Sequence, residues 1–154
     1  MIASRLLADL LPSVRSRFVE FERMADESLR DAGIDLIWTS TYRDSESQDQ
    51  LYAQGRTRPG AIITNARGSE SYHQYRVAAD FALLFYGKTV SKTDDFLMWD
   101  NTPKRTTLWK SIGVLAELSG LEWAGRWKSF RELAHVQYTG GLTIAQLKSG
   151  MIPK

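Results

Sequence analysis

Ser71-Tyr72-His73-Gln74-Tyr75-Arg76-Val77-Ala78-Ala79-Asp80 is the stretch around which the rest of the chain is organised. It contains one of the two histidines of the protein and ends in an aspartate. The apolar run from Val77 to Phe85 predicts a buried strand. A carboxylate within such a strand is costly unless it is paired, hydrogen-bonded or bound to a metal ion. The stretch therefore predicts a polar site built on a core strand.

The second histidine, His135, lies far downstream in Glu132-Leu133-Ala134-His135. Two imidazoles and one carboxylate suit Zn²⁺ and leave a coordination position open for water. We therefore predict that His73, Asp80 and His135 bind the metal and that Glu132 acts as a general base. Taken singly, each residue is more often structural, and an aspartate equally caps a turn. The combination of all four favours a zinc peptidase.

The bulk composition narrows the class of protein. With 154 residues, 43% hydrophobic and 25% charged, the chain is long enough for a real core, and we expect residues 1–154 to form one domain. A formal charge of +2 gives no case for a nucleic-acid-binding protein. The absence of cysteine excludes thiolate zinc sites and cysteine proteases. No apolar run approaches the ~20 residues that span a bilayer, so we expect no stable membrane association.

The N-terminal segment resembles a signal peptide only superficially. Asp9 and Pro12 interrupt its apolar run too early, and Arg15 follows. We therefore expect synthesis in the cytoplasm without a signal peptide.

Hydrophobic periodicity predicts helices and strands in mixed order. We expect helices over residues 13–32, 45–54, 106–119 and 143–148, and strands over 34–42, 77–85 and 134–138. Between them lie a long loop at 55–70, an irregular segment at 94–105 in which Trp99 covers one end of the core, and an aromatic, glycine-containing loop at 121–127. In that loop, core packing is expected for at least one of Trp123 and Trp127. This order indicates an α+β domain with a small antiparallel sheet flanked by helices.

Arg43 stands at the junction of a predicted strand and a predicted helix. The following Ser45-Glu46-Ser47-Gln48 predicts a capping box that begins the helix at Ser45. At such a junction we expect an exposed arginine. It is either an ordinary surface charge or an anchor for a substrate carboxylate or carbonyl oxygen.

Other hydrolytic sites have less support. The chain has no G-x-S-x-G elbow, no H-E-x-x-H helix and no glycine-rich phosphate loop. A pair of carboxylates of the glycosidase type stays open, because 18 acidic residues offer many pairs and none is singled out.

The motif residues resemble a known family. Ser71-x-His73-x-x-Arg76-x-Ala78-x-Asp80 is similar to the S-x-H-x-x-G-x-A-x-D signature of the zinc LD/DD-peptidases of bacterial cell walls, and Glu132-x-x-His135 resembles their second signature. That family includes D-alanyl-D-alanine carboxypeptidases and L-alanyl-D-glutamate endopeptidases, and its fold is related to the Hedgehog signalling domain. Further similarity to phage endolysins and related L-alanyl-D-glutamate peptidases lies in four segments: Thr39-Ser40-Thr41-Tyr42-Arg43 with Gln48, Leu51 and Tyr52, then Gln54-Gly55-Arg56-Thr57, Thr64-Asn65-Ala66 and Trp123-Ala124-Gly125-Arg126-Trp127.

The resemblance implies roles for single residues. His73, Asp80 and His135 would bind zinc, Glu132 would be the catalytic base, and Arg43 would lie in the substrate cleft with a part in catalysis. Ser71 would orient the substrate or the metal site. Arg76 replaces the motif glycine, so a position that needs positive φ would strain it and would place its charge near the metal. Ala134 replaces a proline common before the second histidine.

The function implied is that of an endolysin: a monomeric zinc endopeptidase that cuts peptidoglycan between L-alanine and D-glutamate. It would be made in the host cytoplasm and would act on the wall in the periplasm after release. As a bacteriophage enzyme that lyses its host cell, it would be antimicrobial. Two alternatives stay open. One is a D-alanyl-D-alanine carboxypeptidase on the same site, and the other is an inactive metal-stabilised domain that binds peptidoglycan.

Overall fold

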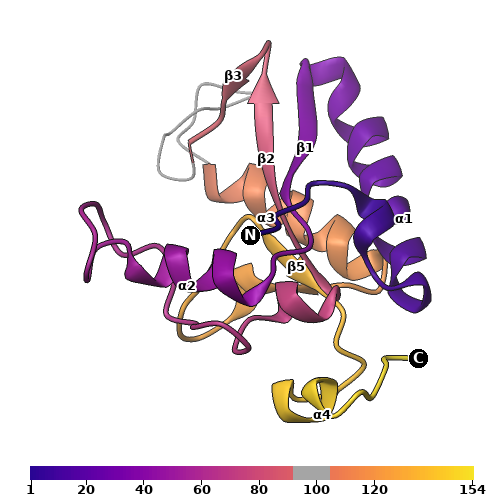
Figure 1. Cartoon of the computed structure of the whole chain (residues 1–154). Coiled ribbons are helices and arrows are strands. Elements are labelled where there is room, and N and C mark those ends of the chain that lie inside the picture. Colours follow the sequence, from indigo (N-terminus) through magenta and orange to yellow (C-terminus); the bar gives the residue numbers. More distant parts are fainter. Residues whose placement is uncertain (92–104) are drawn as a thin grey trace.

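The computed structural model of the chain describes residues 1–91 and 105–154, and its elements alternate between helices and strands (Figure 1). The α-helices are α1 (Pro12–Leu29), α2 (Ser45–Ala53), α3 (Arg105–Leu118) and α4 (Ile144–Lys148). The strands are β1 (Ile34–Ser40), β2 (Ala78–Phe85), β3 (Lys88–Thr89), β4 (Glu122–Trp123) and β5 (His135–Gln137). Short 3-10 turns are η1 (Leu7–Asp9), η2 (Arg30–Ala32), η3 (Tyr72–Tyr75) and η4 (Ala124–Arg126).

The strands form one antiparallel sheet in the order β1-β2-β5-β4, and β3 pairs with the far end of β2. The α+β class predicted from the sequence is therefore confirmed. Most predicted elements are present, with ends that differ by a few residues. Two short strands were missed: β4 lies within the predicted loop at 121–127, and β3 follows the strand predicted at 77–85. The predicted irregular segment with Trp99 falls, except for its last residue, outside the described residues.

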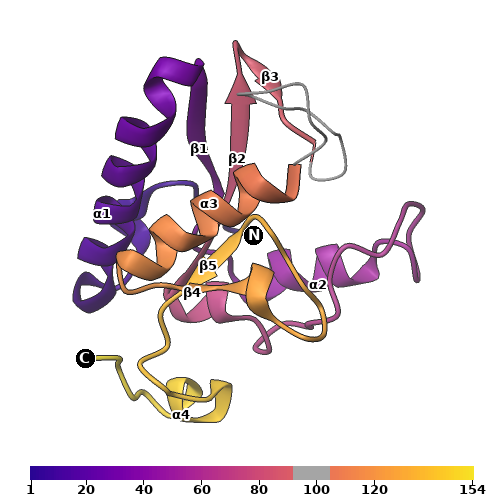
Figure 2. The same cartoon turned by 180° about the vertical axis from the view of Figure 1, so that it is seen from behind.

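The core lies between the sheet and helices α1 and α3. Helix α3 passes behind the sheet in Figure 1 and in front of it in Figure 2, so it covers one face. The buried residues of α1 recur at helical spacing: Val14, Phe18, Phe21, Ala25 and Leu29. Phe81 of β2 meets Phe21 at 5.5 Å and Trp109 at 5.8 Å between ring centroids. Aromatic packing thus joins both helices to the central strand.

Alternation along β2 places the polar site on the other face of the sheet. Ala79, Phe81 and Leu83 are buried in the core, and Asp80 lies between the first two. Successive side chains of a strand point to opposite faces. Asp80 therefore points away from α1 and α3, and its side chain keeps 31% of its surface exposed.

Asp44, and not Ser45, caps helix α2. The Asp44 carboxylate accepts a hydrogen bond from the backbone N–H of Ser47 at 2.9 Å. The predicted start of the helix at Ser45 is right, but the predicted capping residue is wrong. Within residues 1–91 and 105–154, none of the helices has the length and apolar character that a bilayer crossing requires.

Candidate active site

Strand register brings the two halves of the site together. Asp80 of β2 is the direct antiparallel partner of His135 of β5. His73 lies on the single turn η3, immediately before β2. Ligand atoms from His73, Asp80 and His135 all lie within 4.8 Å of one another. The three residues predicted to bind metal thus converge, although one of them is far away in sequence.

Each imidazole is oriented by one partner on each side. His73 places Nδ1 2.8 Å from the carbonyl oxygen of Thr41 and Nε2 3.3 Å from Asp80 Oδ2. A carbonyl oxygen only accepts, so Nδ1 donates and the lone pair of Nε2 faces Asp80 when the ring is neutral. His135 places Nδ1 2.8 Å from Asp80 Oδ1 and Nε2 3.0 Å from Gln137 Oε1. Both rings therefore turn one nitrogen toward the shared carboxylate.

The charges of the site are strongly coupled. Burial favours the neutral form of Asp80, but the two imidazoles outweigh it and hold the pKa of this carboxyl well below its usual value. Burial likewise opposes a charged His135. The hydrogen bond and charge of Asp80 nevertheless raise the pKa of that imidazole above its ordinary value. A metal ion binds only a neutral imidazole, so protons compete with the metal for His135 and metal affinity should fall at acidic pH.

Arg43 is not the exposed residue that its position in the sequence indicated. Its side chain is only 11% exposed. The guanidinium donates to Gln48 Oε1 and Ser40 Oγ, each at 2.8 Å, and lies 3.4 Å from Asp80 Oδ2. The interpretation as an ordinary surface charge is therefore wrong. Arg43 places a fixed positive charge beside the shared carboxylate.

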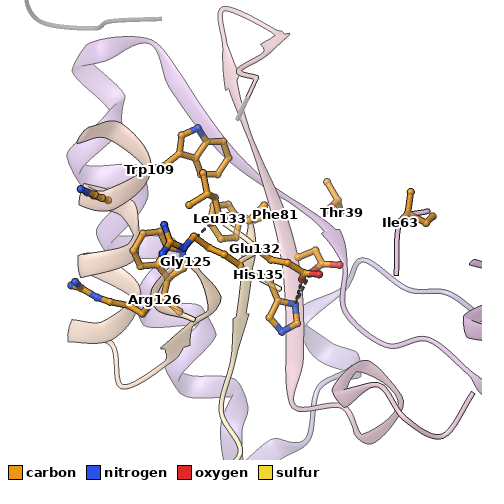
Figure 3. A pocket seen from close by; sticks show the side chains of 14 residues that line it. Thr39, Ile63, Phe81, Trp109, Gly125, Arg126, Glu132, Leu133 and His135 are labelled. Carbon is orange, nitrogen blue, oxygen red and sulfur yellow. Dashed lines mark hydrogen bonds and ion pairs between the residues drawn. The ribbon is translucent and has the colours of Figure 1, made fainter. Parts of the chain in front are cut away.

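Glu132 lies at the mouth of the site. Its carboxylate is 51% exposed, and Oε2 is 3.8 Å from His135 Nδ1. The backbone of Glu132 is tied at both ends, since its N–H donates to Ala124 O and its carbonyl accepts from the N–H of His135. Figure 3 shows Glu132 and His135 side by side on the cleft wall. A carboxylate that is fixed at its backbone and open to water suits proton transfer.

A cleft of about 920 Å³ opens beside these residues. Asp80, Glu132 and His135 line it together with apolar and basic side chains, among them Phe81, Trp109, Trp123, Lys110, Arg126 and Arg131 (Figure 3). A second hollow of about 480 Å³ shares Ile63, Arg131 and Glu132 with it and is bounded by the loop at 62–66 and by Phe130. The two hollows thus meet at Glu132.

Trp123 and Trp127 take different roles. Trp123 is buried in the core, and its indole N–H donates to Leu133 O at 2.9 Å. Trp127 is half-buried, and its ring lies 5.6 Å from the ring of His135. The prediction that at least one of the two packs in the core is confirmed. The other lies against a predicted metal ligand.

Arg76 adopts the backbone conformation that the motif glycine implies, with φ of 59°. Its side chain compensates for the strain of this position. It donates to Asp9 O at 2.9 Å and lies 3.9 Å above the ring of Tyr42. The charge is thus engaged by the N-terminal segment and Tyr42. Ala134 is buried, and its carbonyl accepts from Phe81 N, a bond that a proline at this position would also permit.

Ser71 begins the turn that holds His73. Its N–H donates to Gln74 Oε1 at 3.1 Å. Ser71 is not one of the described residues that line the two hollows. Its role toward substrate or metal stays a prediction.

No orienting role was predicted for Thr41, Gln48, Gln137 or Trp127. Thr41, Gln48 and Trp127 were noted in segments that resemble phage endolysins, without such a role. Gln137 had a positional signal, because it follows His135 by two residues on the same predicted strand, where side chains share a face. The orienting role of buried Gln48 depends on partners on a distant loop and on Arg43, which the sequence does not place.

Comparisons with known proteins agree with this geometry. The D-alanyl-D-alanine carboxypeptidase family matches residues 64–138, a range that contains both signatures in full. The peptidoglycan L-alanyl-D-glutamate endopeptidase CwlK of Bacillus subtilis is 39% identical over 109 residues, 68% of this chain. The chain belongs to the LD/DD-peptidase family. It spans 61% of the length of CwlK.

Solved structures of this family share the fold. The L-Ala D-Glu endopeptidase ChiX of Serratia marcescens superposes with a TM-score of 0.54 at 16% identity, covering 86% of this chain and 83% of ChiX. The LD-carboxypeptidase LdcB gives a TM-score of 0.56 at 18% identity, covering 96% of this chain and 76% of LdcB. At these identities the likeness establishes the LD/DD-peptidase fold alone.

Proposed function

We propose that this protein is a zinc-dependent endopeptidase that hydrolyses the L-alanyl–D-glutamate bond of peptidoglycan stem peptides. The observation that carries the proposal is the convergence of His73, Asp80 and His135, whose ligand atoms lie within 4.8 Å, with Glu132 at the cleft mouth. The identity to an L-alanyl-D-glutamate endopeptidase over 109 residues supports the choice of bond.

The donor set fits zinc. Two imidazole nitrogens and one carboxylate oxygen are ligands that Zn²⁺ takes, and three protein ligands leave a position for water. The ion would be held by His73 Nε2, by His135 Nδ1 and by an oxygen of Asp80. The other ring nitrogens face the carbonyl oxygen of Thr41 and Gln137 Oε1. When bound, zinc supplies a Lewis acid that activates water at neutral pH and polarises the substrate carbonyl.

The side chains of the protein then handle protons and charge. Glu132 accepts the proton of the attacking water and delivers it to the leaving amine as the peptide C–N bond breaks. Arg43 is held by Gln48 and Ser40, and its charge favours the oxygen that becomes negative in the transition state. The buried bonds of Arg43 fix that charge before substrate arrives.

Charge on the cleft wall favours an acidic substrate. Lys110, Arg126 and Arg131 line the cleft, and Arg126 is paired with Glu117. In a stem peptide the D-glutamyl residue adds a carboxylate next to the bond we propose is cut. A D-alanyl-D-alanine terminus likewise offers one carboxylate next to its bond, so the charge of the wall fits both substrates. The 39% identity to an L-alanyl-D-glutamate endopeptidase supports the endopeptidase over the D-alanyl-D-alanine carboxypeptidase.

Digestion of purified peptidoglycan tests the proposal. Mass spectrometry should find stem peptides released with D-glutamate at their new N-terminus, and a strong chelator should abolish the release. Metal analysis should find about one zinc per chain. Loss of terminal D-alanine alone, with stems still attached to muramic acid, would establish the carboxypeptidase. Binding of peptidoglycan with no cleavage by zinc-loaded protein would establish the inactive binding domain.

We further propose that the enzyme acts as a phage endolysin that reaches the wall in the periplasm after release from the cytoplasm. Similarity of the segments around Arg43 and Arg56 to phage endolysins supports this. Added to Gram-negative cells with a permeabilised outer membrane, the protein should lower turbidity within minutes. Intact turbidity alongside cleavage of purified peptidoglycan would contradict the lytic role and leave the peptidase activity in place.

A further inference from the structure

A chain of hydrogen bonds runs from His135 across the end of the sheet. His135 Nε2 lies 3.0 Å from Gln137 Oε1, and Gln137 Nε2 donates to Glu122 Oε2 at 2.9 Å. The other oxygen of Glu122 accepts from Thr139 Oγ1 at 2.8 Å. His135, Gln137 and Thr139 are all buried. Three buried polar side chains are thus joined through one carboxylate of β4.

The direction of every bond in this chain follows from Glu122. A carboxylate accepts hydrogen bonds and does not donate them, so the amide nitrogen of Gln137 must face Glu122. The amide oxygen of Gln137 must then face His135, and this oxygen only accepts. His135 Nε2 must therefore hold its proton. The ring turns the lone pair of Nδ1 toward Asp80 whenever Nδ1 is not protonated.

We propose that Gln137 and Glu122 are positioning residues that fix the tautomer and the ring orientation of His135 as a metal ligand. The inference rests on the proposed zinc site and adds two residues that neither the motif nor the comparisons assign. Strand pairing builds the chain, because Glu122 of β4 is the register partner of Gln137 of β5. The short β4 strand therefore has a function beyond the sheet: it delivers the carboxylate that sets the direction of the chain.

The variant Glu122→Gln tests the direction of the chain with little change in shape. The new amide can present either its oxygen or its nitrogen to Gln137, so it no longer fixes the orientation of the Gln137 side-chain amide. Partners that orient a metal ligand typically change metal affinity ~10–100-fold, and we expect a loss of affinity in that range from competition with a chromophoric zinc chelator. Gln137→Leu, which removes the acceptor outright, should lose at least as much.

Thr139→Val is the matched control. It removes the other hydrogen bond to Glu122 and leaves Gln137 and His135 untouched. We expect its zinc affinity to stay within about threefold of wild type. This change is smaller than the ~10-fold loss expected when an orienting partner is removed. Far-ultraviolet circular dichroism on each variant verifies the fold. Wild-type zinc affinity in folded Glu122→Gln and Gln137→Leu would overturn the proposal, as would an equal loss in Thr139→Val.

A readout without metal separates this inference from the proposed function. Long-range nitrogen–proton NMR correlations report which ring nitrogen of a neutral histidine is protonated. In metal-free wild type at alkaline pH, His135 should show the Nε2–H form alone, and Glu122→Gln should show a mixture. A mixture in wild type would overturn the inference even if zinc binds. A single Nε2–H form in a protein that binds no zinc would sustain the inference about orientation and reject the zinc peptidase.

Discussion

The two sides of the cleft are built differently. On one side, Asp80 and His135 are paired strand residues, and both imidazoles have a fixed hydrogen-bond acceptor. On the other side lie the loop at 55–70 and the segment around Phe130, with Ile62, Ile63 and Phe130 exposed. The two sides therefore differ in their expected tasks, which are metal binding on one side and choice of substrate on the other. The sheet and the turn η3 hold the residues that would bind metal, and the loops contribute walls that would help to choose the substrate.

Glu132 lies where these two sides meet, and its removal should have the largest effect. Glu132→Gln keeps the shape but loses the proton acceptor, and such groups typically contribute ~10²–10⁴-fold to rate. We expect the rate of stem-peptide release to fall by that factor. Zinc content should stay unchanged, because the three sheet-side ligands are intact. Loss of zinc together with activity would show that Glu132 also supports the metal site. That result would contradict the division between a metal-binding side and the rest of the cleft.

Gln48 connects the two sides and should give the next effect. It is fully buried, accepts from Arg43, and donates to Ala66 O at 2.8 Å on the loop. Gln48→Leu would leave these buried groups without partners at a cost of about 1–3 kcal/mol. If part of that cost appears in the transition state, cleavage should slow by roughly 10-fold, since 1.4 kcal/mol corresponds to that factor.

The expected signature of Gln48→Leu is slower cleavage with unchanged zinc affinity. Gln50→Leu on the same helix is the control, because within residues 1–91 and 105–154 the side chain of Gln50 makes only a long 3.5 Å hydrogen bond with Arg58. Equal slowing in both variants would show a general effect of helix α2. A loss of zinc in Gln48→Leu would show that the loop supports the metal ligands as well.

Gly113 tests how firmly the core supports the sheet side. A Cβ at this position would clash with the ring of Trp123, whose indole N–H donates to the carbonyl oxygen of Leu133 beside Glu132. Alanine gains up to ~1 kcal/mol of helix propensity over glycine. Overpacking a core costs ~1–3 kcal/mol, so Gly113→Ala should lower the free energy of unfolding overall. Val114→Ala, on the exposed face of the same helix, should change it by less than ~0.5 kcal/mol. Urea denaturation measures both, and a more stable Gly113→Ala would show that Trp123 yields easily.

The sequence predicted the sheet side better than the loop side. Two histidines, a carboxylate in an apolar strand and a nearby glutamate were enough to choose His73, Asp80, His135 and Glu132 from the order of residues alone. The apolar run from Val77 to Phe85 also predicted strand β2, because a short continuous apolar run is typical of a buried strand.

What the sequence lacked was information that only tertiary neighbours hold. Arg43 was expected to be exposed because its partners, Gln48 and Asp80, come from elsewhere in the chain. The role of Gln137 depends on Glu122, which lies in a two-residue strand too short for any periodicity to show. Arg76 takes a left-handed backbone where the motif has glycine, and its contacts with Tyr42 and Asp9 come from distant parts of the chain.

The smallest effect concerns Asp44, which caps α2 next to Arg43 on the loop side. Hydrogen bonds from Ser47 lower the pKa of Asp44 to about 2. Because the folded-state pKa is below the unfolded value of ~3.9, the charge stabilises the fold above that value and is lost as pH falls through 2. Asp44→Asn retains a capping side chain without charge. The difference in urea midpoint between wild type and Asp44→Asn should therefore be largest above pH ~4 and shrink toward pH 2. A difference that stays constant with pH would mean that the charge of Asp44 contributes nothing to the anchoring of α2.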